Sequence, residues 1–393
     1  MENRVCIVGI GFVESEPSVL GLSHKELLFH STRKALDDAG LERKDIGGAI
    51  TSSYDFLEGR SLSNQYSLDS IGGVMKPCDL RLGEDGIYTL FAGYMEVMTD
   101  PSKFVVVASV QKASDMGGPE GSTYPKLVLA SMEPVFSRPV CSSIPNVMGI
   151  EAVLAAMEAR AFMERTGLTE EQLAKVAVKN LNNNNSGTKK AGADLGDVLN
   201  SEMLSWPIRR LMKAKETDAA CTLILGSERK VRSMTKPMVF IRGIGWCSDQ
   251  SHLAFRPQGV ARETKGAASQ AYKMAGVQHP DKEIDLGEIS DWYAHRELMH
   301  CEALGFCSAE EMGSRIADAA FEKAGALPIN VSGGLLGRGN AIGTSGLLRV
   351  AQVALQIRGQ ANGYQVPGVG VGLAHSWSGI PVACAGVTVL SKW

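Results

Sequence analysis

The sequence predicts an α/β fold, because strand-like and helix-like segments alternate from the N-terminus onward. A short β-branched run at 4–10 is followed by an amphipathic stretch that Ser23 opens and Gly40 ends. A second apolar run at 45–51 follows this helix. Strand, helix and strand in this order form a βαβ unit with a mostly parallel sheet.

The sequence also predicts two similar halves. The run Val239–Ser248 (VFIRGIGWCS) echoes Val5–Phe12 (VCIVGIGF). Each run precedes a helix that ends in Ala-Gly and then a strand that begins with Asp. The same order of elements, with the same residues at their ends, indicates a duplicated fold. We therefore expect halves near 1–235 and 236–393, with an insertion at about 115–215 in the first half.

The remaining elements follow from apolar spacing. The run 103–110 (KFVVVASV) does not alternate with polar residues, so it is expected to be a strand buried on both faces. Thr169 precedes two glutamates and is the expected N-cap of a helix. Periodicity predicts further helices near 86–98, 150–165, 169–180, 265–276 and 347–358, and further strands at 219–225 and 285–292.

Composition limits the classes of function. The 393 residues are 44% hydrophobic and 21% charged, with a formal net charge of −3 and a pI near 6.2, which gives no general attraction to nucleic acid or anionic membrane. We find no apolar run long enough for a membrane span and no signal or transit peptide. The eight cysteines contain no Cys-x-x-Cys pair, so we expect no structural zinc, reduced thiols and a cytoplasmic location.

A glycine-rich stretch near the C-terminus, Asn330–Gly346, is the most informative part of the chain. Glycine is used where the backbone must turn with positive φ or approach another group closely. The stretch continues directly into the predicted helix 347–358. Its free N–H groups and dipole favour an anion or developing negative charge.

This stretch resembles the glycine-rich loop of the thiolase superfamily, through Asn330–Gly334 and Gly339–Gly346. The segment Asp291–Gly305 resembles the sterol-carrier-type branch of that superfamily, and the resemblance extends over nearly the whole chain. It implies a thiolase fold, a duplicated five-layered α/β/α/β/α architecture with an inserted loop domain. It also implies a homodimer that forms through the sheet edge of the first half.

Three positions depart from the catalytic pattern of the family. The segment Gly83–Gly86 matches the place of the nucleophilic cysteine, so Gly83 stands where the thiol is expected and Glu84 lies next to it. Ser290 and Asn340 replace two catalytic histidines. A thiolase forms an acyl-enzyme on its cysteine. The resemblance therefore makes Claisen condensation or thiolysis through an acyl-enzyme an improbable activity.

What the resemblance leaves is a set of acid–base and hydrogen-bonding groups around a thioester. The chain resembles the steroid side-chain aldolases, which lack the nucleophile, use tyrosines and have a small zinc-ribbon and OB-fold partner. Retro-aldol cleavage of a β-hydroxyacyl-CoA is the implied reaction, with coenzyme A as part of the substrate and no tightly bound cofactor or metal. The implied catalytic residues are Tyr293, His375, Asn340 and His295, and the implied CoA-contacting residues are Ser332, Gly333, Gly334 and Gly343. Ile342 lies near the place of a second tyrosine.

Other interpretations remain open. Cys78 or Cys141 is a candidate relocated nucleophile, which would make the chain an acyltransferase or a β-ketoacyl-CoA thiolase subunit. The chain is alternatively a non-catalytic subunit of a hetero-oligomer. Tyr293 and His375 also suit ordinary structural roles, and His300 is expected to be structural. Glu84 and Asp85 suit the cap of the helix that follows, because carboxylates stabilise a helix N-terminus.

Overall fold

In the computed structural model, nine strands form one hydrogen-bonded sheet in the order β3-β2-β4-β7-β1-β8-β11-β10-β9. The structure describes residues 4–19, 21–55, 67–116, 150–183, 192–232, 234, 237–250, 255–379 and 383–393. The strands are β1 (Val5–Glu16), β2 (Ile46–Ser52), β3 (Cys78–Leu82), β4 (Phe104–Gln111), β7 (Asp218–Ser227), β8 (Val239–Ser248), β9 (Leu286–Glu288), β10 (Val371–Gly379) and β11 (Ala383–Ser391). A separate pair joins β5 (Met203–Ser205) to β6 (Ile208–Arg209).

The sheet has two parts that repeat one topology. They meet at a short antiparallel contact between β1 and β8, where Cys6 pairs with Phe240 and Ile7 with Val239. Moving outward, β1-β7-β4-β2 and β8-β11-β10-β9 each contain two antiparallel pairings followed by a parallel one. In the first part β3 extends the edge in parallel, and in the second part Ile329 makes a single parallel bridge to Gly287.

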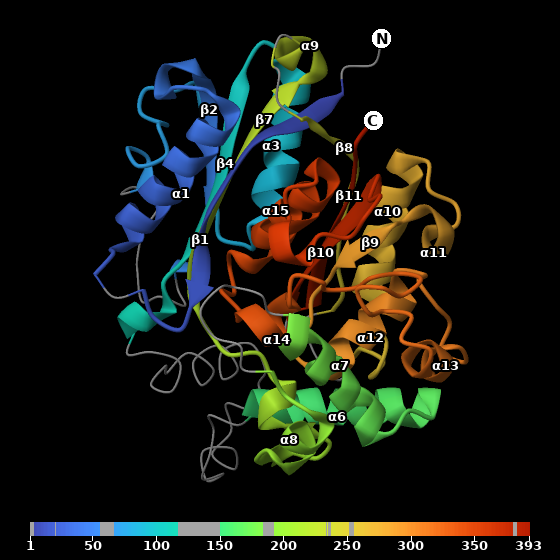
Figure 1. Cartoon of the computed structure of the whole chain (residues 1–393). Coiled ribbons are helices and arrows are strands. Elements are labelled where there is room, and N and C mark those ends of the chain that lie inside the picture. The colour runs from blue at the N-terminus through green and yellow to red at the C-terminus, as the bar shows by residue number, and fades with distance from the viewer. Residues whose placement is uncertain are drawn as a thin grey trace.

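Helices cover both parts, as Figure 1 shows. The helices α3 (Ile87–Thr99) and α15 (Ser345–Arg358) lie between the two parts of the sheet and share one apolar core with them. The helix α1 (His24–Ala39) packs on the other face of the first part, and α10 (Arg262–Ala275) with α12 (Ala294–Ala303) on the other face of the second. The predicted five-layered α/β architecture is confirmed.

Three further helices lie together at one end of the molecule. The helices α6 (Ile150–Thr166), α7 (Glu170–Asn183) and α8 (Leu195–Asn200), drawn in green in Figure 1, share a core with α10 and α12. The remaining helices are α9 (Glu228–Val231), α11 (Pro280–Glu283), α13 (Met312–Ala317) and α14 (Gly334–Arg338). No helix in the described part of the chain is long and apolar enough to cross a membrane.

Several features predicted from short stretches of sequence agree with the structure. Ser23 caps α1 in a reciprocal capping box with Glu26, and Gly40 ends the helix at φ 69°. Thr169 accepts a hydrogen bond from the Gln172 N–H at 3.3 Å, as expected of the N-cap of α7. Every residue of β4 is buried, as its lack of alternation predicts.

The strand predicted at 285–292 is shorter than expected, since β9 covers only Leu286–Glu288. The next backbone N–H groups bond to side chains instead of a neighbouring strand. The Ile289 N–H donates to Asn330 Oδ1 at 2.8 Å, and the Ser290 N–H donates to His375 Nδ1 at 3.2 Å. These bonds direct the chain out of the sheet toward α12.

Candidate active site between the glycine-rich loop and two helix N-termini

The glycine-rich loop, residues 330–346, turns on positive φ angles. Gly333 has φ 106° and Gly339 has φ 101°, conformations that residues with a side chain rarely adopt. A Cβ atom added to Gly339 would also collide with the side chain of Thr217. The loop contains one short helix, α14, which the sequence analysis did not predict.

Two buried carboxylates hold the first part of this loop. Glu288 accepts hydrogen bonds from the Ser332 N–H at 3.0 Å and the Ser332 hydroxyl at 2.7 Å. Asp291 accepts from the N–H groups of Leu335 at 2.6 Å and Leu336 at 3.1 Å, and so caps α14. These contacts occupy Ser332 and bring Gly333 and Gly334 against Asp291, so the geometry favours an anchoring role for this part of the loop.

Gly343 connects the second part of the loop to the first half of the fold. Its N–H donates to Gln111 Oε1 at 3.2 Å, and its carbonyl accepts from the Gly86 N–H at 2.7 Å. A Cβ atom at this position would lie 2.9 Å from Cδ2 of Tyr54. Gly343 therefore permits close contact between the loop and the tyrosine that follows β2.

Asp85 lies where the N-termini of α3 and α15 meet. Its Oδ1 accepts from the Ile87 N–H at 2.9 Å, and its Oδ2 accepts from the Gly346 N–H at 3.0 Å. Burial raises the pKa of Asp85 to about 6, against the lowering effect of these hydrogen bonds and of Arg349. The cap predicted for α3 is confirmed for Asp85. The N–H of Gly346 at the start of α15, which we expected to face the substrate, is occupied by this carboxylate.

Tyr293 precedes α12, and its side chain is fully buried. Its hydroxyl has no hydrogen-bond partner among the described residues. Burial raises the pKa of Tyr293 well above its ordinary value, and the negative charges of Glu151 and Glu216 add to this effect. The phenol is therefore neutral at physiological pH, and its unpartnered hydroxyl is free to bind a further group.

The segment 213–217 joins Tyr293 to Asn340. On one side Lys213 forms an isolated bridge with Tyr293, and the Ala214 N–H donates to the Trp292 carbonyl at 2.8 Å. On the other side the Asn340 N–H donates to the Lys215 carbonyl at 2.7 Å. This segment brings together two of the predicted catalytic residues.

The side chain of Asn340 is oriented by one hydrogen bond. Asn340 is 4% exposed, and its Oδ1 accepts from the Ser345 hydroxyl at 3.0 Å. Its Nδ2 group makes no hydrogen bond to another described residue. The amide N–H groups of Asn340 are therefore available as donors, as an oxyanion-binding role requires.

Charged groups surround Tyr293. Lys213 forms an ion pair with Glu151, and its Nζ lies 5.9 Å from the centroid of the Tyr293 ring. Glu216 forms no ion pair with a described residue. Burial raises the pKa of Glu216 to about 7, with a further contribution from Glu151. The sequence analysis did not predict a role for Glu216, although this residue lies two positions before β7, a strand that begins with the polar residue Asp218.

His295 contacts the insertion. Its Nε2 lies 3.1 Å from Oε2 of Glu158, which also forms an ion pair with Arg296. Burial lowers the pKa of His295, against the raising effect of Glu158. The centroids of the His295 and Tyr293 rings are 6.0 Å apart.

His375 lies on β10, and both of its ring nitrogens have protein partners. The Ser290 N–H donates to Nδ1, so Nε2 carries the proton and faces Thr264 Oγ1 at 3.2 Å. Thr264 Oγ1 also lies 3.0 Å from Nδ1 of His300. Burial lowers the pKa of both histidines well below the ordinary value. The geometry favours a positioning role for His375, and it agrees with a structural role for His300.

Tyr54 is a site residue that the sequence analysis did not find. Its hydroxyl donates to Glu84 Oε2 at 3.0 Å and lies 3.0 Å from the Ser378 hydroxyl. Glu84 is the residue next to the position of the missing thiol. The available signal was the place of Tyr54 just after β2, since functional groups gather at the carboxyl ends of parallel strands.

The described cysteines do not replace the nucleophile. Cys6, Cys221, Cys301 and Cys307 are buried, and Cys247 and Cys384 are half-buried. The Sγ of Cys384 lies 3.2 Å from the Ser248 hydroxyl, and burial raises the pKa of Cys384. A thiol with a raised pKa is a poor nucleophile at neutral pH. Cys141 and the side chain of Cys78 lie outside the described residues. No group of His, Cys, Asp and Glu side chains in the described ranges has the arrangement of a metal site.

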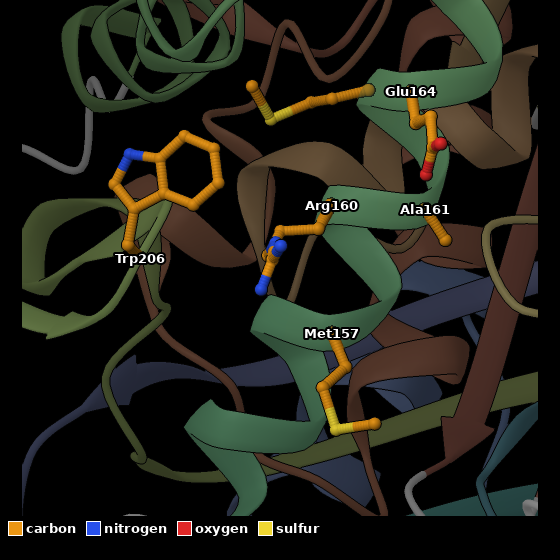
Figure 2. A pocket seen from close by; sticks show the side chains of 6 residues that line it. Met157, Arg160, Ala161, Glu164 and Trp206 are labelled. Atoms are coloured by element: carbon orange, nitrogen blue, oxygen red, sulfur yellow. The ribbon is translucent and has the colours of Figure 1, made fainter.

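A surface pocket of about 640 Å³ lies beside α6. In Figure 2 Arg160 and Trp206 lie next to each other, and the guanidinium carbon lies 5.6 Å from the centroid of the Trp206 ring. Met157, Ala161, Met163 and Glu164 complete the lining. Glu151, close to Tyr293, begins the same helix, so α6 connects the pocket with the site.

Comparisons with known proteins agree with this architecture. Residues 245–392 match a family model described as thiolase C-terminal domain-like. An acetyl-CoA acetyltransferase of Methanothermobacter thermautotrophicus is 28% identical over 369 residues, which cover 91% of this chain and 92% of the relative. A 17-hydroxy-3-oxo-4-pregnene-20-carboxyl-CoA lyase of Mycobacterium tuberculosis is 25% identical over 395 residues, which cover 98% of each.

Among solved structures, the Ltp2-ChsH2(DUF35) aldolase superposes with a TM-score of 0.82 at 24% identity, covering 99% of this chain and 97% of that chain. This likeness shows the fold. Residues 245–392 thus match a thiolase C-terminal domain-like family, and over nearly its whole length the chain is similar to an acetyl-CoA acetyltransferase and to a steroid side-chain CoA lyase and shares the fold of an aldolase.

Proposed function

We propose that this protein cleaves a carbon–carbon bond in a β-hydroxyacyl-CoA by a retro-aldol reaction, without a covalent acyl-enzyme. The observation that carries the proposal is the identity of the residues that precede α3. Gly83 stands in the place of a thiol, and the Asp85 carboxylate, not a substrate group, binds the first N–H groups of α3 and α15.

The chemistry requires a base, an acid and an oxyanion site. A base takes the proton of the β-hydroxyl group, and the Cα–Cβ bond breaks to leave a ketone or aldehyde. The electron pair of that bond becomes the enolate of the shorter acyl-CoA. Asn340 is proposed to hold the enolate oxygen through Nδ2, and Tyr293 to donate a proton to the α-carbon. The neutral, unpaired phenol of Tyr293 suits a donor.

Two relatives support different reactions on this fold. The acetyltransferase relative supports acyl transfer, and the lyase relative supports carbon–carbon cleavage. The described cysteines favour the lyase, because none of them lies at a helix N-terminus, where a thiolate is stabilised. The acyltransferase reaction remains the second candidate, with a nucleophile at Cys78 or Cys141.

The pocket beside α6 is proposed to bind the nucleotide end of coenzyme A. Arg160 supplies a positive charge for phosphate, and Trp206, 51% exposed, supplies a face for the adenine ring. Arg160 lies nine residues along α6 from Glu151, or about 13 Å at 1.5 Å per residue. An extended pantetheine arm spans such a distance. Arg160→Ala is expected to raise KM for the CoA thioester and to leave kcat unchanged.

Two kinds of assembly belong to the proposal. A homodimer would pair the exposed edge strand β3, on which Leu80 is 43% exposed. The name of the similar solved structure, the Ltp2-ChsH2(DUF35) aldolase, joins two components, and a small second subunit of this kind is proposed for the present chain. Light scattering on the purified protein, with and without the candidate subunit, tests both.

The deciding experiment incubates the protein, alone and with the candidate subunit, with a panel of β-hydroxyacyl-CoA and β-ketoacyl-CoA thioesters. Mass spectrometry then identifies the products. The proposal expects a shorter acyl-CoA and a free carbonyl compound from a β-hydroxyacyl-CoA. Thiolysis of a β-ketoacyl-CoA, with an acyl group attached to the protein, would establish the acyltransferase instead.

A further inference from the structure

The proposed cleavage needs a base for the β-hydroxyl proton, and His375 does not supply one, because both of its ring nitrogens have protein partners. His295 faces Glu158 through Nε2, and its Nδ1 has no hydrogen-bond partner among the described residues, but the side chain is fully buried. Tyr293 is neutral and is assigned to the opposite proton transfer. A base that exchanges its proton directly with water must therefore come from a more exposed part of the site than His295.

We propose that Tyr54 and Glu84 form this base, a two-residue proton relay in which Tyr54 contacts the substrate hydroxyl and Glu84 stores the proton. This inference rests on the proposed retro-aldol function and assigns a further pair of catalytic residues to it. The Tyr54 hydroxyl already donates to Glu84 Oε2 at 3.0 Å, so the second transfer in the relay has its geometry in place.

The position of Tyr54 places the relay beside the loop that carries Asn340. The Tyr54 ring contacts Gly343, three residues after Asn340. The segment that follows Lys213 binds Asn340 from another direction and leads to Tyr293. Tyr54 thus lies against the loop near Asn340, and Tyr293 is linked to Asn340 through the segment 213–215.

The surroundings of the pair suit proton transfer. Ser378 on β10 lies 3.0 Å from the Tyr54 hydroxyl and fixes its direction. Glu84 forms no ion pair with a described cation, so its carboxylate is not neutralised by a salt bridge. Burial raises the pKa of Glu84, which strengthens the carboxylate as a base. Glu84 remains partly exposed and can exchange its proton with water.

The step balances in atoms and charge. The β-hydroxyl proton passes to the Tyr54 oxygen as the Tyr54 proton passes to Glu84. The oxygen–hydrogen electron pair of the substrate forms the new carbonyl, and the Cα–Cβ pair forms the enolate. Tyr293 then protonates the α-carbon. Glu84 afterwards releases its proton to water, and Tyr293 regains one from water.

The test separates the two half-reactions. Cleavage of the β-hydroxyacyl-CoA that the wild type accepts needs the relay. Exchange of the α-hydrogens of propionyl-CoA in deuterated water is the reverse of the Tyr293 step: the ionised Tyr293 removes the α-hydrogen, Asn340 holds the enolate oxygen, and the relay takes no part, so the exchange is measured at the highest pH at which the protein stays folded. Tyr54→Phe and Glu84→Gln are expected to lower the cleavage rate by about 10²–10⁴-fold. Both variants are expected to keep the exchange rate of the wild type within about threefold, whereas Tyr293→Phe loses both reactions.

Tyr272→Phe is the matched control, because the Tyr272 hydroxyl donates only to the Leu304 carbonyl, at 2.8 Å, in another part of the fold. If the wild type cleaves the substrate and Tyr54→Phe cleaves it at the same rate, the relay is wrong and the proposed function stands. Loss of both cleavage and exchange in Tyr54→Phe and in Glu84→Gln also overturns it, since that result shows a structural role. A wild type that cleaves no member of the panel overturns the proposed function and the relay with it.

Discussion

The Asp85 carboxylate accepts a hydrogen bond from the Gly346 N–H at 3.0 Å, although 261 positions of sequence separate them. The same carboxylate accepts from Ile87, so one side chain caps two central helices. Loss of one cap costs about 0.5–2 kcal/mol. We therefore predict that Asp85→Ala lowers the free energy of unfolding by about 1–4 kcal/mol, measured by urea titration.

A matched control for this prediction is Asp194→Ala. Asp194 accepts from the Asp197 N–H at 2.7 Å and caps only the exposed helix α8. Its loss is expected to cost about 0.5–1 kcal/mol. Equal effects of the two substitutions would contradict the double role of Asp85.

Tyr293→Phe is expected to separate activity from stability. Removal of a proton donor lowers kcat by about 10²–10⁴-fold. The hydroxyl has no partner among the described residues, so its removal leaves the melting temperature unchanged or raises it. Tyr272→Phe, which loses a bond to the Leu304 carbonyl, is expected to cost about 1 kcal/mol and to keep activity. Steady-state kinetics and thermal unfolding of both variants test the contrast.

Asn340→Ala is expected to lower kcat by about 10²–10³-fold, because it removes one donor to the enolate oxygen. Ser345→Ala removes only the hydrogen bond that orients Asn340. We expect a smaller loss of kcat for this variant and a normal KM for both. An effect on KM alone would assign Asn340 to substrate binding rather than to the enolate.

Iodoacetamide is expected to leave activity largely intact, since no acyl-enzyme forms. The half-buried Cys247 and Cys384 are the expected sites of labelling among the described cysteines. Cys384→Ser is expected to retain the activity of the wild type. Inactivation with label on Cys78 or Cys141, together with protection by substrate, would instead support the acyltransferase.

The buried Asp291 is expected to contribute stability that falls as the pH rises from about 4 to 7, whereas the buried His295, His300 and His375, whose pKa values are lowered, contribute stability that rises over this range. Burial, with a contribution from Glu297, raises the pKa of Asp291 from 3.8 to about 7 in the folded state. At Asp291 the folded state therefore binds more protons than the unfolded state in this window, and each step up in pH reduces the contribution of this residue to the free energy of unfolding. Asp85 and Glu216, with raised pKa values, act in the same direction as Asp291. Asp291→Asn is expected to make the slope of the free energy of unfolding against pH more positive than that of the wild type.

The control for the pH dependence is Asp281→Asn on the exposed helix α11, which is expected to keep the slope of the wild type. Urea titrations at several pH values give the slopes directly. An Asp291→Asn variant with the slope of the wild type would contradict the assignment.

Local chemistry allowed several features to be predicted from the sequence. The α/β class, the five layers and the strand β4 follow from apolar spacing and from the resemblance, and the cap at Ser23 follows from its own residue types. The sequence also shows directly that residue 83 is a glycine and residue 340 an asparagine, and the resemblance implies that they stand in place of a catalytic cysteine and a catalytic histidine. Each of these features depends on residues that are neighbours in the chain or on one position read alone.

Only the tertiary structure decided which of these groups can react. Tyr54 meets Glu84 and Ser378 because β2, α3 and β10 converge at one end of the sheet, and no local pattern records that convergence. The same holds for His375, whose nitrogens are occupied by groups from α10 and from the chain after β9. Sequence periodicity tells which face of an element is buried, whereas the hydrogen-bond partner of a buried group depends on how distant elements pack.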